Sequence, residues 1–183
     1  VQQLYGRDVR IFPPSGLRAA DSYYSRHVPA SESPGRLYLG CMGQGATPLF
    51  SLVQLCSALS QVQNEMELKP EAADGYWTQV IFHNSRRELG KTMTLSRDDI
   101  PSRIKVIGSD QSRLRAPDEV VELSANLAGY EIPKVLDQLN ITKGEKGAID
   151  ILACTNMFSV GVDISRLGLM VINGQPKTTA EYI

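Results

Sequence analysis

The feature that most constrains the fold is a set of short, almost unbroken apolar runs separated by polar or amphipathic stretches. AIDILAC (148–154) and VVELSA (120–125) are two of these runs. A strand that is apolar at successive positions is buried on both faces, which is the situation of a parallel sheet covered by helices. The pattern therefore predicts an α/β fold, a three-layer domain with a mostly parallel sheet flanked by helices.

The expected elements follow from periodicity and from turn residues. Apolar residues recur at three- and four-residue steps after Pro48, which predicts an amphipathic helix to about Leu68. A second helix is expected from Asn84 or Ser85 to about Leu95, and KPEAADG (69–75) is expected to be a polar loop. The remaining elements are a helix over 132–139 and strands over 9–14, 35–42, 77–83, 103–108, 120–125, 148–154 and 167–174.

Composition gives little indication of a partner. The chain has 183 residues, is 42% hydrophobic and has a net charge of −1, so it can bury a core but has no overall attraction for nucleic acid. Charge is nevertheless unevenly distributed. Residues 86–115 contain eight Lys or Arg residues and four Asp or Glu residues, a local basic stripe that either binds nucleic acid or is simply a solvated face.

The cysteines and histidines do not suggest a metal site. Cys41, Cys56 and Cys154 are an odd, widely spaced set, which is typical of free thiols in a reducing, cytoplasmic compartment. We interpret all three as small buried apolar residues. His27 and His83 lie at no ligand spacing from cysteines or carboxylates, so no metal site is expected. No apolar run is long and unbroken enough to predict a transmembrane segment.

Both ends of the chain predict that it belongs to a longer protein. It opens on Val1, and it closes on TTAEYI, where Thr178 and Glu181 have the spacing of a capping box that begins a helix. We expect a single lobe over residues 1–183, with an entry segment and loop at 1–34 and the sheet and helices at 35–183.

In an open parallel sheet, ligands bind beyond the carboxyl ends of the strands. This rule selects the loops after His83, Ser124 and Cys154. Thr155 follows its strand directly, so its hydroxyl and amide are candidates to bind a phosphate oxygen. Gly161 permits close backbone approach, and Asp163 is a candidate to accept from a ribose hydroxyl or to hold an arginine. The alternative is that Gly161 forms a turn and Asp163 caps it.

The loop after WTQVIFH (77–83) is a second candidate phosphate site. Asn84, Ser85 and Arg86 stand where the next helix is expected to begin, and polar donors and arginines at a helix N-terminus suit a phosphate backbone. The alternative is an ordinary helix cap with solvated arginines. GCMGQGAT (40–47) lacks the GK[ST] ending of a phosphate loop, and the chain has neither Walker A nor Walker B.

Three of these segments carry a resemblance. TNMFSVGVDI (155–164) resembles motif V of superfamily 2 helicases, VIFHNSRREL (80–89) resembles motif IV, and ELSAN (122–126) resembles the strand-end loop that follows. Longer blocks extend the match over nearly the whole chain: LYGRDVRIFPPSGL (4–17), PGRLYLG (34–40) and VGVDISRLGLMVINGQPKTTAEYI (160–183). Together they resemble the second RecA-like lobe of the large helicase of DISARM-type bacterial phage defence.

The resemblance implies an ATP-driven helicase or translocase acting on nucleic acid, more specifically DNA. ATP and Mg would be bound mainly by a first RecA-like lobe, and motif VI would follow Ile183, so this fragment alone would be inactive. Other defence-system subunits are possible partners, and no membrane is implied. The roles implied for individual residues are nucleic-acid contact by Asn84, Ser85, Arg86, Ser124 and Thr155, and a position near the nucleotide for Gly161 and Asp163.

Two other functions remain open from the sequence. One is a non-catalytic RecA-like module that docks protein or nucleic acid, for which the complete protein would lack GK[ST] upstream. The other is a small-molecule enzyme on a doubly wound sheet. The absence of any Cys/His, Ser/His or paired-carboxylate constellation from the sequence argues against an enzyme of that kind.

Overall fold

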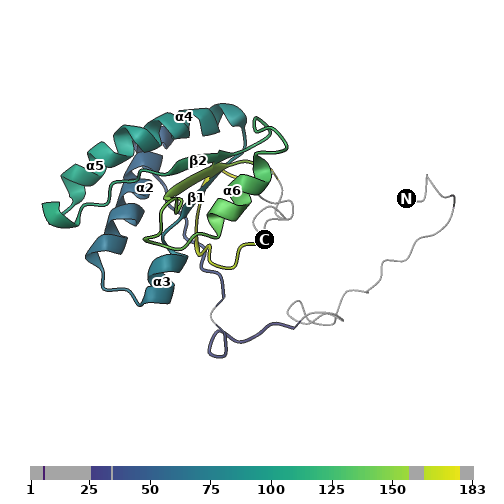
Figure 1. Ribbon diagram of the computed structural model, residues 1–183, viewed down its shortest axis with the longest axis horizontal. Helices are drawn as coiled ribbons and strands as arrows, with labels where there is room; N and C mark the ends of the chain where they lie inside the picture. The colour runs from purple at the N-terminus through teal and green to yellow at the C-terminus, as the bar shows by residue number, and fades with distance from the viewer. Residues whose placement is uncertain (1–5, 7–25, 34, 157–162, 178–183) are drawn as a thin grey trace. The chain divides into compact units, whose positions relative to one another are not determined.

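The structure is a computed structural model that describes residues 6, 26–33, 35–156 and 163–177 (Figure 1). The chain divides into two units, Val1–Cys41 and Met42–Ile183. Among the described residues, the helices and the sheet lie in the second unit. The strand expected at 9–14 lies outside the described residues.

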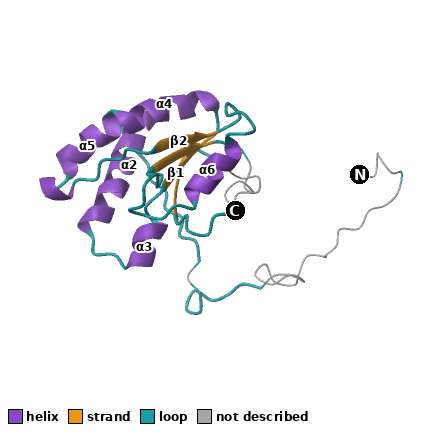
Figure 2. Cartoon of the chain, in the orientation of Figure 1, coloured by secondary structure: helices purple, strands orange, loops and turns teal. Residues whose placement is uncertain are grey.

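The second unit alternates helices and strands, as Figure 2 shows by colour. The strands are short and the two helices α2 and α4 are the longest elements. In chain order the elements are α2 (Pro48–Glu65), α3 (Pro70–Gly75), β1 (Gln79–His83), α4 (Arg86–Arg97), α5 (Asp99–Ile107), the 3-10 turn η1 (Gln111–Arg113), β2 (Val120–Leu123), α6 (Ile132–Leu139), β3 (Ile151–Cys154) and β4 (Leu169–Asn173).

In the described part of the chain, four strands form one parallel sheet in the order β2-β3-β1-β4. β1 and β3 are central, and every residue of both strands is buried. The near-continuous apolar sequences QVIFH and ILAC therefore do what their pattern predicts, since each contributes side chains to both faces of the sheet.

Helices cover both faces of this sheet (Figure 1). On one face, α2 and α5 pack on the strands, with Cys56, Ile81 and Ile104 in the same buried cluster. On the other face, Val135 and Leu139 of α6 pack with apolar side chains of the strands. The predicted three-layer α/β fold with a parallel sheet is confirmed.

Residues 103–108 were expected to form a strand, and this expectation is wrong, because 103–107 belong to helix α5 and Gly108 is its C-cap. Ile100 and Ile104 are 0% and 1% exposed, whereas Val106 is 71% exposed. Burial at positions i and i+4 matches the helical period, while a strand would have buried 104 and 106 on the same face. The run IKVI is too short for its apolar residues alone to distinguish the two periods.

Residues 69–75 were expected to form a loop, but Pro70–Gly75 is the helix α3. Pro70 occupies the first turn, where its fixed φ suits a helix and its missing N–H is not needed. Glu71 in the same turn favours the positive end of the helix dipole. The polar composition concealed this short helix, which has no buried residue of its own.

No strand forms over residues 35–42 either, although all of them are described. Leu37, Leu39 and Met42 are 79%, 77% and 84% exposed. An apolar run becomes a strand only where a neighbouring strand offers a hydrogen-bonding ladder, and this run has none within the described residues. Among the described helices, none combines the length and apolar character needed to cross a membrane.

Candidate nucleic-acid interface

All four strands end at the same edge of the sheet, so the loops that follow them are neighbours. In the strand registers, Leu123 and Phe82 both pair with Cys154, and His83 pairs with Asn173. The three loops selected from the sequence were those after His83, Ser124 and Cys154. The strands that lead into them end at His83, Leu123 and Cys154, within one residue step of each other across the sheet.

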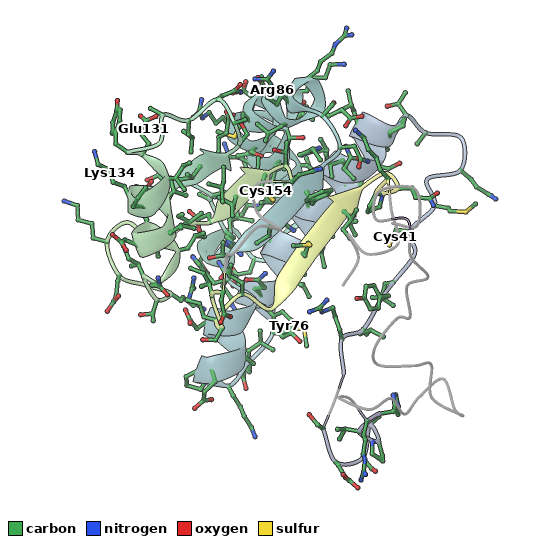
Figure 3. All side chains as sticks on the ribbon, turned by 90° about the vertical axis from the view of Figure 1, so that its right-hand side faces the viewer. Cys41, Tyr76, Arg86, Glu131, Lys134 and Cys154 are labelled. Atoms are coloured by element: carbon green, nitrogen blue, oxygen red, sulfur yellow. The ribbon has the colours of Figure 1, made fainter. Side chains whose placement is uncertain are left out.

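The loop after β1 turns directly into α4. Ser85 is the N-cap, and its hydroxyl accepts a 3.3 Å hydrogen bond from the Glu88 N–H, which confirms the expected helix start. Arg86 is the first helical residue and is exposed (Figure 3). This places a cation beside the free N–H groups of the first turn, an arrangement that suits an anionic ligand.

Asn126 joins this helix start to the loop after β2. Arg86 donates from Nη1 to Asn126 Oδ1 at 3.0 Å, and Asn126 donates from Nδ2 to Glu122 Oε1 at 2.8 Å. Arginine only donates and an ionised carboxylate only accepts, so these two partners fix the orientation of the amide. Glu122 and Asn126 lie in the ELSAN segment but were not among the candidate residues expected from the sequence. A carboxylate in a half-buried strand, which requires a partner, was the available signal.

Ser124 is fully buried beneath this connection. Its hydroxyl donates to Glu122 and accepts a 3.1 Å hydrogen bond from the Asn126 N–H. The Ser124 hydroxyl therefore fixes the loop internally, and its role as a contact to nucleic acid stays a prediction.

The loop after β1 is also tied to the end of β4. Asn84 donates from Nδ2 to the Gln175 carbonyl oxygen at 2.9 Å. One step earlier, Asn173 Nδ2 lies 3.3 Å from Nδ1 of the buried His83. The Asn84 side chain is thus engaged within the protein.

His83 is fully buried, and its Nε2 has no hydrogen-bond partner within the described part of the chain. Burial lowers the pKa of His83 from 6.5 to about 4, and the nearby Glu88 opposes this shift only in part. The imidazole is therefore neutral at pH 7 and adds no positive charge to this edge.

The loop after β3 begins at Thr155, which is half-buried. Its N–H donates to the Leu123 carbonyl oxygen at 3.3 Å and extends the β2–β3 ladder by one residue. Of the two groups considered for phosphate binding, the amide is therefore already used. Gly161 lies outside the described residues, and Asp163 is exposed.

One cation of the basic stripe lies inside the protein. Arg115 is 2% exposed and pairs with Asp150 at 3.2 Å between Nη2 and Oδ1. It also donates to Gln63 Oε1 at 2.8 Å and to the Trp77 carbonyl oxygen at 2.7 Å. Arg115 thus connects the segment before β2 to the starts of β1 and β3, and it adds nothing to a nucleic-acid surface.

Arg166 lies on the segment that leads from β3 back to β4. Its Nη1 donates to Thr78 Oγ1 at 3.1 Å and to the Leu139 carbonyl oxygen at 3.0 Å. Thr78 precedes β1 and Leu139 ends α6, so Arg166 fastens the segment at the edge opposite to Arg86.

The cysteines differ from one another. Cys56 and Cys154 are fully buried, and burial raises the pKa of each thiol to about 12. Cys41 is exposed, so the interpretation of all three as buried residues is wrong for Cys41. Within the described residues, no group of three or more His, Cys, Asp or Glu side chains is placed to hold a metal ion.

No protein-family profile matches the chain. A search of solved structures finds the helicase Lhr of Mycobacterium smegmatis bound to single-stranded DNA and AMP-PNP. That match has a TM-score of 0.40 at 15% identity and covers 72% of this chain and 14% of the other, which is too distant to carry an argument about fold or function.

A curated relative is much more similar in sequence. The chain is 39% identical over 189 aligned residues to the DISARM protein DrmA of Bacillus paralicheniformis. The match covers the whole of this chain and 17% of the length of the relative. The chain is therefore similar throughout to one segment of a DISARM protein, and the resemblance to DISARM inferred from its sequence is confirmed.

Proposed function

We propose that the chain is the C-terminal motor lobe of an ATP-dependent superfamily 2 DNA helicase or translocase of phage defence. In this proposal the lobe binds the nucleic-acid backbone and closes an ATP site whose main part belongs to a first lobe. The observation that carries the proposal is the common position of three loops. In the segments that resemble motifs IV and V and in ELSAN, the loops leave their strands at one edge of one parallel sheet.

The residues at this edge fit a phosphate backbone better than bases. Arg86 is exposed at the start of a helix, and the neighbouring loop orients it through Asn126. Such contacts position a strand without reading its sequence. We therefore propose binding with little sequence preference, through Arg86, Ser85 and the Thr155 hydroxyl.

The proposal gives Asp163 the role of linking this strand contact to the nucleotide. Asp163 is exposed, so its carboxylate is accessible to a ribose hydroxyl or to an arginine of the first lobe. It follows Thr155 by eight residues along the chain, so the proposed backbone contact and the proposed nucleotide contact are close in sequence. ATP supplies the free energy, and Mg would be held with it by the first lobe.

The experiment is ATP hydrolysis by the complete protein, with and without single-stranded DNA, for the wild type and for Asp163→Ala. We expect DNA to stimulate hydrolysis in the wild type and to lose that effect in the variant. Asp137→Ala removes the same charge from an exposed position of α6 and is the matched control. A folded wild-type protein that hydrolyses no ATP would favour the non-catalytic docking module instead.

A further inference from the structure

The structure holds Arg86 and Glu122 close to the same amide without joining them. Both side chains bond to Asn126, Arg86 to its Oδ1 and Glu122 to its Nδ2. Both residues lie in the described part of the chain, and they form no ion pair with each other. We propose that Asn126 is a positioning residue, a neutral spacer that keeps Arg86 from pairing with Glu122 and so preserves its charge for a phosphate.

This inference rests on the proposed function, and it adds a role for a residue that the sequence argument did not select. Two neutral donors, the Ser124 hydroxyl and the Asn126 amide, both bond Glu122 Oε1. The carboxylate is thus held in place by neutral groups and keeps its negative charge, which is the charge that could attract Arg86. Arg86 is bonded to a neutral oxygen and retains its full charge, together with the guanidinium N–H groups that Asn126 does not use.

The alternative arrangement shows why the spacer matters. A guanidinium bonded directly to a carboxylate forms a neutral pair, and a phosphate would then have to displace the carboxylate. Without the Asn126 side chain, the exposed Arg86 is free to swing toward Glu122, and Glu122 loses one of its two donors. Truncation at 126 should therefore impair phosphate binding by redirecting Arg86.

The geometry separates this role from a structural one. The hydrogen bond that shapes the loop runs from the Asn126 backbone N–H to Ser124 Oγ, and any residue at 126 except proline retains it. The side chain is exposed, and its hydrogen bonds to described residues are those with Arg86 and Glu122. Substitution of the side chain thus leaves the loop intact and changes the partner available to Arg86.

The test is binding of a fluorescent oligo-dT to the complete protein, followed by anisotropy over a range of salt concentrations. The variants are Arg86→Ala, Asn126→Ala and the double variant Asn126→Ala/Glu122→Gln. Arg97→Ala is the control, because it removes the same charge at the exposed far end of α4. We expect Asn126→Ala to weaken binding by about as much as Arg86→Ala, roughly tenfold. Its salt dependence should fall by about one phosphate contact, and Arg97→Ala should match the wild type.

The double variant decides the matter. The amide introduced by Glu122→Gln still accepts from Ser124 but has no charge to capture Arg86, so adding this substitution should restore most of the affinity and the salt slope. A merely structural role for Asn126 predicts no restoration. Binding of Asn126→Ala that equals the wild type, or a double variant as weak as the single one, would overturn the inference while leaving the proposed function standing. A wild-type protein that does not bind the oligonucleotide would overturn both.

Discussion

Arg166 and Asp74 form a two-pronged ion pair at the edge of the sheet opposite to Arg86. Arg166 Nη2 lies 2.7 Å from Asp74 Oδ1, and Nε lies 3.0 Å from Oδ2. The Arg166 side chain is 10% exposed and that of Asp74 is 23% exposed. The hydrogen bonds from Arg166 are the main reason that the pKa of Asp74 lies below its ordinary value. One guanidinium thus joins α3 to the segment that precedes β4.

Arg166→Lys should destabilise the protein although it keeps the charge. An ammonium cannot reproduce a fork that bonds both carboxylate oxygens and also reaches Thr78 and Leu139. We expect a loss of about 2 kcal/mol in the free energy of unfolding, measured by urea denaturation. Arg97→Lys at an exposed position is the control. Equal stability of the two variants would show that the fork contributes nothing beyond its charge.

His83 predicts how stability depends on pH. Its folded pKa of about 4 lies below the value of about 6.5 expected for an unfolded chain, so the unfolded state takes up the proton first. The contribution of neutral His83 to the free energy of unfolding is complete above about pH 6.5. It is lost as the pH falls toward 4, and the loss is up to about 3 kcal/mol. His83→Gln should therefore flatten the curve of unfolding free energy between pH 7 and 4.5. An unchanged slope in that interval would contradict the assignment to His83.

Substituting alanine for two of the glycines should change the free energy of unfolding in opposite directions. A Cβ on Gly168 would lie 2.9 Å from the Gly75 carbonyl oxygen, which already accepts the Gly168 N–H at 2.7 Å. Backbone must therefore move, and we expect a loss of about 1–3 kcal/mol. Gly90 is exposed within α4 and has no atom within 4 Å of an added Cβ, so Gly90→Ala should stabilise by about 0.5–1 kcal/mol. Thermal unfolding of both variants beside the wild type tests this pair, and shifts of the same sign would contradict it.

The sheet and the edge that carries the candidate site were the most predictable parts of the molecule. β1 and β3 were recognisable because both of their faces are buried, which leaves no polar alternation in the sequence. Once the strands are parallel, the loops after His83 and Cys154 must share an edge, so the candidate site followed from topology without any distances.

The connections were less predictable, because tertiary contacts decide them. The apolar run at 103–108 fits a strand as a string of residues, but packing of Ile100 and Ile104 selects the helical period. The bridge from Arg86 through Asn126 to Glu122 depends on side chains 40 and four residues apart, and only the sheet order brings them together. From the sequence, Arg115 is one of the cations of the basic stripe. Its pairing with Asp150, which removes it from the surface, is visible only in the structure.

The hydrogen bonds of Arg166 also limit how far Asp163 can move. Arg166 is bonded to Asp74, Thr78 and Leu139, and Asp163 is only three residues away along the chain. Three residues span about 10 Å when fully extended. Arg166 is therefore a fixed point from which Asp163 cannot move far. While Arg166 keeps its hydrogen bonds, Asp163 must stay within about 10 Å of it. A larger movement of Asp163 would first have to break the hydrogen bonds from Arg166 to its oxygen partners.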